Sequence, residues 1–221
     1  GVQTFLLPGA FVVLTMSNML AADGRCKTLD QSADGYVRAE ACGVMELELG
    51  ADELHQALVV VCGSTVNQDG RSSSLTAPNG PSQQAVIRSS VEGAEMPLAQ
   101  YEQHEMHGTG TPLGDPIEVG AACAVLVGSK VSTQRPIKLS AAKIAHGHAE
   151  AGAGVVGALE ALASLAHAHG SLLTTLRVVN PYVADTLNVA RVTLAPREDF
   201  ALVSTHAAGG AASGISSFAF Q

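Results

Sequence analysis

Strand-like and helix-like segments alternate along this chain, and this alternation constrains its fold more than any other feature. Residues 57–63 form a continuous apolar, Val-rich run, which is typical of a strand buried on both faces of a sheet. Pro and Gly positions predict helices from 81 to about 95, from 116 to about 127, and from near 154 to a stop at 170. Strands that alternate with helices predict an α/β fold, in which helices cover a mostly parallel or mixed sheet.

The composition is that of a globular chain with a negative charge. The 221 residues are 47% hydrophobic, which is enough for the core of one large domain or two small ones. The formal net charge is -8, the sequence pI is near 5.4, and the 12 Lys and Arg residues are scattered. This pattern lacks the basic footprint of a nucleic-acid-binding domain.

The cysteines and the first twenty residues bear on the compartment. The four cysteines lie far apart without a Cys-x-x-Cys spacing, so we expect reduced thiols rather than a zinc site or a redox pair. Residues 1–20 are apolar, but Gln3, Pro8 and Asn18 interrupt them and no basic leader precedes them. We therefore expect a soluble cytoplasmic protein without a membrane span. Residue 1 is Gly and the apolar pattern is already under way there, so we expect a chain cut from something longer.

The run from His107 to Pro116, HGTGTPLGDP, is the best candidate for chemistry. It places one imidazole beside two hydroxyls on a backbone that glycines keep open, a set able to donate hydrogen bonds to an oxygen that gains negative charge. The alternative is a polar loop that only joins a strand to the helix at Pro116.

Two other patterns are weaker. Eight histidines include close pairs such as His146-x-His148, but no further ligands accompany them with metal-site spacing. The glycines at 152, 154 and 157 match the letters of a dinucleotide fingerprint, yet no acidic residue follows between residues 172 and 184 to bind a ribose. Close helix packing explains these glycines better, and we expect neither a metal nor a bound nucleotide.

A second basic and acidic group, Lys143 with His148 and Glu150, precedes the helix near residue 154, and here the chain resembles a known family. Five ordered motifs resemble the β-ketoacyl synthase (ketosynthase) domain of type I polyketide and fatty acid synthases. They are DGRCKTLDQSADGYVRAEACG at 23–43, STVNQDGRSSSLTAPNGPSQQAVIR at 64–88, EMHGTGTPLGDPIE at 105–118, KIAHGHAEAGAG at 143–154 and SGISSFAF at 213–220.

This resemblance implies a thiolase-like, layered αβαβα fold that is incomplete here. Residues 1–56 would be the end of the N-terminal half, and residues 57–221 the C-terminal half, truncated before its closing loop. Complete members of the family are usually homodimers. The implied activity is that of an acyltransferase of the 3-oxoacyl-[acyl-carrier-protein] synthase type, in polyketide or fatty acid biosynthesis.

The implied reaction is a decarboxylative Claisen condensation. A cysteine accepts an acyl chain from the phosphopantetheine arm of an acyl carrier protein, a malonyl-type extender loses carbon dioxide, and its carbanion attacks the acyl thioester. No cofactor is bound permanently, and the partners would be the carrier protein and other synthase domains. Two neutral imidazoles suit the decarboxylation, because they can donate N–H bonds to the enolate oxygen.

Position by position, the resemblance makes His107 and His148 the two catalytic histidines and Lys143 the lysine that tunes them electrostatically. Thr109 and Thr111 match threonines that hydrogen-bond the pantetheine arm, although both could simply stabilise the loop.

The aromatic ring of Phe220 matches that of a gating loop beside the acyl pocket, although it could equally be part of the core. His146, which replaces another residue type in the second motif, could face the site instead of His148. The pairing of Gly147 with His148 favours His148.

The chain also departs from the family. The nucleophilic cysteine of the family lies in a TACSSS-type elbow upstream of the part that Gly1 resembles, and Cys26, Cys42, Cys62 and Cys123 do not replace it. We therefore expect no condensation from this chain alone. The alternatives are a degenerate ketosynthase-like scaffold or dimerisation module, and a thiolase, which the motif loops disfavour. If a carrier protein docks here, the one local basic group is Arg25, Lys27 and Arg38.

Overall fold

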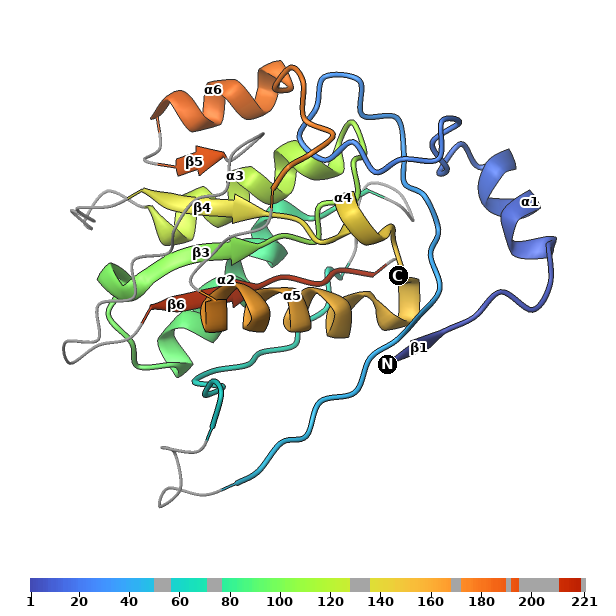
Figure 1. Ribbon diagram of the computed structural model, residues 1–221. Coiled ribbons are helices and arrows are strands. Elements are labelled where there is room, and N and C mark those ends of the chain that lie inside the picture. Colours follow the sequence, from blue (N-terminus) through green and yellow to red (C-terminus); the bar gives the residue numbers. More distant parts are fainter. Residues whose placement is uncertain are drawn as a thin grey trace.

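A parallel sheet of four strands organises the molecule (Figure 1). The computed structural model describes residues 1–49, 57–70, 77–127, 136–167, 172–189, 192–194 and 211–219. The strand order is β5-β4-β3-β6, and every neighbouring pair is parallel. The strands are β3 (Tyr101–Glu105), β4 (Ile137–Ser140), β5 (Val192–Leu194) and β6 (Ala212–Ile215).

Helices lie on both faces of this sheet (Figure 1). Helices α2 (Gly80–Gly93) and α3 (Gly114–Leu126) pack together behind it in the view of Figure 1, and α5 (Ala153–His167) crosses its front along β3 and β6. Helix α6 (Pro181–Val189) packs against α3. The expected α/β architecture is confirmed.

The three predicted helices occur where the sequence placed them, within a few residues. Helix α2 begins because the side chain of Asn79 accepts a hydrogen bond from the Ser82 N–H at 3.2 Å, and Pro81 suits the first turn. Helix α5 ends at His167, and the expected stop at Gly170 lies outside the described residues.

The core lies between the sheet and α3. Leu139 of β4 and Met106, which follows β3, pack there against Val119 of α3. Leu29 and Leu173 join them from neighbouring loops. All five side chains are at most 1% exposed. Two of these residues come from loops rather than regular elements, so packing fixes the loop at Leu29 against the carboxyl end of the sheet.

The predicted strand at residues 57–63 is wrong. This segment is not a strand, and Leu58, Val60 and Val61 are 79%, 53% and 69% exposed. A strand needs a neighbour for its backbone hydrogen bonds, and no strand of the described residues pairs with this one. Gly63 does approach the end of α2, where a Cβ atom at position 63 would lie 2.6 Å from the Ser90 carbonyl oxygen.

The N-terminal segment runs past the carboxyl ends of the parallel strands (Figure 1). Strand β1 (Val2–Gln3) pairs with β2 (Ala41–Cys42), and between them the chain forms α1 (Gly9–Met16), which stands away from the sheet. Short turns of helix complete the fold: α4 (Lys143–His146), η2 (Leu98–Gln100) and η3 (Glu150–Gly152). Among the described helices, none has the length and apolar character that a membrane crossing requires.

Candidate active site

The carboxyl ends of three parallel strands bring the candidate residues together. Strand β3 leads directly to His107, β4 leads through α4 to His148, and β6 leads to Phe218. Because parallel strands end at the same edge of a sheet, residues that are distant in the sequence meet there. The ring centroids of His107 and His148 are 5.3 Å apart, in an edge-to-face arrangement.

Aromatic rings flank this pair of imidazoles. The Phe218 ring lies 5.8 Å from the His107 ring, and the Tyr36 ring lies 5.0 Å from the His148 ring, both as centroid distances. Sequence reasoning placed the aromatic residue at Phe220, which lies outside the described residues. The Ser-Phe-Ala-Phe stretch holds two aromatic residues, and spacing alone did not distinguish them.

Backbone N–H groups select the same tautomer for both histidines. The N–H of Phe218 donates to Nδ1 of His107 at 3.2 Å, and the N–H of Glu150 donates to Nδ1 of His148 at 3.2 Å. A backbone N–H can only donate, so each Nδ1 must be the acceptor nitrogen of a neutral ring. The proton of each imidazole is therefore on Nε2, and both rings offer an N–H donor.

The surroundings keep both rings neutral. Burial and the nearby charge of Lys143 together lower the pKa of His148 to about 4, although Glu150 opposes the shift. Burial, Lys143 and His148 hold the pKa of His107 well below its ordinary value. At neutral pH the site thus presents two uncharged imidazoles as hydrogen-bond donors.

The His107 loop is held by a buried carboxylate that sequence reasoning missed. Glu118 of α3 accepts hydrogen bonds from the backbone N–H groups of His107, at 2.6 Å, and Gly108, at 2.9 Å. Gly108 adopts φ +49°, and a Cβ atom there would lie 2.9 Å from the side chains of Ala141 and Thr28. Only glycine fits this position, because the backbone is left-handed and the space is filled.

A second buried carboxylate ties this loop to the N-terminal segment. Asp115 accepts from the N–H of Leu29 at 2.7 Å and from the N–H of Gly110 at 3.1 Å. The hydroxyl of Thr28 also donates to the carbonyl of Gly108 at 2.6 Å. Asp115 and Glu118 stand in the first turns of a helix that follows a Gly-rich loop, which was the signal available in the sequence.

Lys143 lies at the start of α4 and is 5% exposed. Burial lowers its pKa, while the neighbouring carboxyls of Glu118 and Glu105 oppose that shift. Burial in turn raises the pKa of Glu118 and of Glu105 to about 7 each and that of Asp115 to about 6. The lysine predicted to act electrostatically therefore sits among three buried acids. Its charge reaches both imidazoles and lowers the pKa of each.

The segment before His148 also requires glycine. Gly147 has φ +74°, and a Cβ atom there would lie 3.0 Å from the Cβ of Ala39. The backbone of His148 is then held on both sides, because its N–H donates to the Val37 carbonyl at 2.7 Å and its carbonyl accepts from the Ala39 N–H at 3.0 Å. The backbone of Val37 and Ala39 thus helps to position His148.

The two threonines differ in their surroundings. Thr111 Oγ1 accepts a hydrogen bond from the Gly114 N–H at 3.1 Å, which closes the turn before α3 and supports the loop-stabilising alternative for this residue. Its hydroxyl proton stays available to another acceptor. Thr109 is half-buried between Gly108 and Gly110 on the His107 loop.

His146 does not join the site. Its side chain is 53% exposed, and its Nε2 lies 3.4 Å from a carboxylate oxygen of Glu160. The described residues contain no group of three or more His, Cys, Asp or Glu side chains placed to hold a metal ion. The glycines of the fingerprint serve packing: a Cβ at Gly154 would lie 3.2 Å from Ser217, and one at Gly157 would lie 3.5 Å from Glu105.

Two of the three residues of the basic group named above, Lys27 and Arg38, are paired with acidic side chains. The Arg38 side chain is 5% exposed and is paired with Glu150, so it offers little free charge at the surface. Lys27 is paired with Asp23 at 3.1 Å and with Asp34 at 2.7 Å. A charge pattern along the sequence cannot distinguish an exposed cation from one that an acidic partner neutralises.

Comparison with known proteins decides the family. The profile of the β-ketoacyl synthase C-terminal domain matches residues 58–177, and that of the β-ketoacyl synthase N-terminal domain matches residues 1–53. The chain belongs to the β-ketoacyl synthase family. The resemblance inferred from the five motifs is thereby confirmed.

The relatives of this ketosynthase chain are much larger proteins, and the chain matches a small part of each. It is 45% identical over 184 residues to polyketide synthase GfsB of Streptomyces halstedii, covering 82% of this chain and 3% of that protein. It is 40% identical over 221 residues to mycoketide-CoA synthase of Mycobacterium tuberculosis, covering 98% of this chain and 5% of that protein. The chain thus spans a small fraction of the curated relatives it matches.

Solved ketosynthases share the fold. The oxazolomycin ketosynthase domain OzmH KS7 of Streptomyces albus is 27% identical with a TM-score of 0.84, covering 99% of this chain and 38% of that one. The ketosynthase from module 6 of the bacillaene synthase of Bacillus subtilis is 26% identical with a TM-score of 0.80, covering 93% and 36% respectively. The expected thiolase-like α/β fold is confirmed.

Proposed function

We propose that this ketosynthase chain forms the decarboxylating part of a condensing site that acts on a malonyl-type thioester in polyketide biosynthesis. The observation that carries the proposal is the pair of neutral imidazoles, His107 and His148, each with its Nδ1 occupied by a backbone N–H. Both Nε2–H groups are then free to donate to one oxygen atom of a substrate.

The chemistry follows from that arrangement. The bond between the carboxylate carbon and the α-carbon of the malonyl group breaks, carbon dioxide leaves, and the electron pair moves onto the thioester oxygen as an enolate. The Nε2–H groups of His107 and His148 stabilise the oxygen as its charge develops. The enolate carbon then attacks the carbonyl of an acyl thioester and expels the thiolate that carried it.

The substrate would arrive on the phosphopantetheine arm of an acyl carrier protein. Thr109 and Thr111 stand on the same loop as His107, which suits a role in hydrogen bonding to that arm. Phe220 would line the acyl side. In the complete enzyme we further propose a homodimer, in which residues 1–56 belong to the N-terminal half and residues 57–221 to the C-terminal half.

No cysteine of this chain is placed as the nucleophile. Burial raises the pKa of the Cys26 thiol, whose sulfur accepts the Val37 N–H at 3.4 Å, and burial raises the pKa of Cys123 to about 11. Cys42 and Cys62 are exposed, away from a strand-to-helix elbow. We propose that the acyl-accepting thiol comes from residues outside these 221, so that this chain decarboxylates but does not condense.

Decarboxylation of malonyl-N-acetylcysteamine tests the proposal, with the acetyl thioester quantified by liquid chromatography. His107→Ala and His148→Ala should each lower the rate by about a hundredfold, the usual loss for one oxyanion donor. His146→Ala is the matched control, and it should retain the parent rate because that ring lies outside the site.

Two results would count against this function. Equal rates in the parent and in both site variants would remove the histidines from the chemistry. A folded parent that releases no acetyl thioester would favour the alternative of a non-condensing scaffold. Acylation of the chain by an acyl thioester, seen by intact mass, would contradict the proposed absence of a nucleophile.

A further inference from the structure

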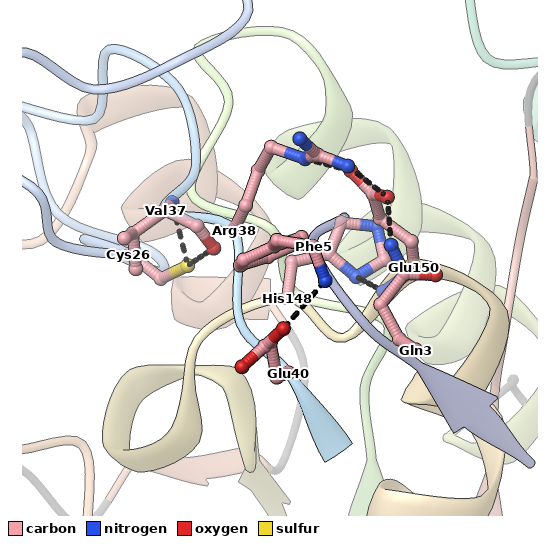
Figure 2. A network of polar contacts seen from close by, with 8 residues as sticks. All are labelled: Gln3, Phe5, Cys26, Val37, Arg38, Glu40, His148 and Glu150. Carbon is pink, nitrogen blue, oxygen red and sulfur yellow. Dashed lines mark hydrogen bonds and ion pairs between the residues drawn. The ribbon is translucent and has the colours of Figure 1, made fainter. Parts of the chain in front are cut away.

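A three-residue polar cluster joins the N-terminal segment to the second histidine, as Figure 2 shows. Both oxygens of the Glu150 carboxylate are bound by Arg38, with Nε–Oε1 at 2.6 Å and Nη2–Oε2 at 2.8 Å. Gln3 Nε2 donates to Oε2 at 2.8 Å. We call Gln3, Arg38 and Glu150 the Glu150 clamp, which joins residues more than one hundred positions apart.

The clamp arginine is itself held rigidly. Its guanidinium carbon lies 4.5 Å from the ring centroid of Phe5 and 4.4 Å from that of Phe11, and these two rings pack edge to face at 4.9 Å. Its remaining nitrogen, Nη1, is buried and has no acceptor among the described residues. Two ring faces and one bidentate carboxylate therefore fix the plane of the Arg38 fork.

Glu150 has an unusual backbone. Its φ is +37°, a left-handed conformation that costs free energy in a residue with a Cβ atom. In this conformation its N–H points to Nδ1 of His148 at 3.2 Å. Such a conformation persists only where the surroundings enforce it, and the clamp binds both oxygens of this residue's carboxylate.

We propose that the Glu150 clamp is a positioning device, which keeps the Glu150 backbone in the conformation whose N–H fixes His148 as the Nε2–H tautomer. Arg38 and Gln3 are then positioning residues, since they act on the substrate only through His148. The consequence for activity rests on the proposed function, whereas the tautomer of His148 does not depend on it.

Loss of the clamp has a chemical signature at His148. Without the Glu150 N–H, the Nδ1 lone pair becomes free, so the ring can carry its proton on either nitrogen and can bind a second proton more easily. The titratable and charged groups that face this ring are Tyr36, His107, Lys143 and Glu150; Lys143 continues to oppose protonation, and Glu150, freed from Arg38, favours it. The pKa of His148 should therefore rise in clamp variants, while His107 stays unchanged.

Imidazole ¹⁵N NMR of the purified protein tests the clamp, with decarboxylation of malonyl-N-acetylcysteamine as a second measurement. Arg38→Gln should give His148 a mixed tautomer, raise its pKa and lower the decarboxylation rate about tenfold to a hundredfold, the usual loss for a displaced catalytic group. Arg38→Lys keeps the charge but not the planar two-donor fork, so it should recover only part of the Nε2–H form. Glu40→Gln is the matched control: Glu40 accepts from the Phe5 N–H beside the clamp but is not part of it, and a glutamine oxygen can still accept, so the His148 tautomer and pKa should stay unchanged.

A second variant covers the case in which Arg38→Gln does not fold. Gln3→Ala removes one hydrogen bond from the carboxylate and should shift the His148 signals in the same direction by a smaller amount. Unchanged His148 tautomer and pKa in folded clamp variants would overturn the proposal, as would equal shifts at His107 and His148, which indicate a general loss of structure. If the parent shows no decarboxylation, the proposed function fails, while the NMR result still decides the clamp.

Discussion

The glycine after the first histidine offers a direct test of how tightly the site loop is packed. Gly108 has φ +49°, and a Cβ atom there would lie 2.9 Å from the side chains of both Ala141 and Thr28. Gly108→Ala therefore adds one methyl group where the backbone disfavours it and where two neighbours already fill the space. The neighbours belong to two different segments, so neither can move without disturbing its own contacts.

The magnitude can be worked out from these two penalties. A left-handed backbone costs about 1–2 kcal/mol in a residue with a Cβ atom, and overpacking by one methyl group costs about 1–3 kcal/mol. Replacing glycine also stabilises by about 0.4–1 kcal/mol, because the unfolded chain loses freedom. Gly108→Ala should thus lower the free energy of unfolding by about 1–5 kcal/mol.

The same substitution elsewhere should have the opposite sign. Gly120 lies within α3, and a Cβ atom there would meet no heavy atom within 4 Å. Gly120→Ala should raise the free energy of unfolding by about 0.5–1 kcal/mol, the helix preference of alanine over glycine. Urea denaturation of both variants beside the parent measures the difference. A Gly108→Ala protein as stable as Gly120→Ala would refute the packing described for the His107 loop.

Two further substitutions test individual contacts. Thr111→Val removes the acceptor of the Gly114 N–H and should cost about 1 kcal/mol of unfolding free energy, while Thr111→Ser, measured in the same urea titration, should restore it. His104 is 1% exposed and contacts Tyr101 and Ser216, and burial lowers its pKa from 6.5 to about 4. Below pH 6.5 the unfolded chain binds a proton that folded His104 refuses, so the parent should lose up to about 1.4 kcal/mol per pH unit relative to His104→Gln down to pH 4. A stability difference that stays constant between pH 7 and pH 4.5 would contradict this account of His104.

Local signals in the sequence predicted the helices well. Pro81 and Pro116 located the first turns of α2 and α3, because proline at a helix start is a local preference of the chain. The meeting of His107 and His148 was also expected, since two motifs of one family imply one site, and their centroids are 5.3 Å apart. Where the carboxyl ends of parallel strands meet, loop residues from different motifs come together.

Contacts between distant segments could not be predicted. The Arg38 side chain meets Glu150 across 112 positions, and nothing near Arg38 in the sequence distinguishes a buried clamp from a surface cation. The apolar run at 57–63 is suited to burial, but its hydrophobic pattern does not say which other segment would cover it. In the structure its side chains are largely exposed. Glu118 was overlooked for a related reason, because its partners are backbone N–H groups, which no sequence letter marks.

The acids around Lys143 explain how a buried cation can stand beside two donor imidazoles. Burial raises the pKa of Glu118 and of Glu105 to about 7, and the backbone N–H bonds that each accepts from the loops of the site oppose that shift. Their charge in turn offsets the cost of burying the lysine. Burial and then the lysine lower the pKa of both imidazoles and keep them neutral, and the positive charge of the lysine favours an enolate at the same place. The acids Glu118 and Glu105, which hold the loops of the site, therefore also help to keep the Lys143 ammonium charged near the place where the enolate oxygen becomes negative.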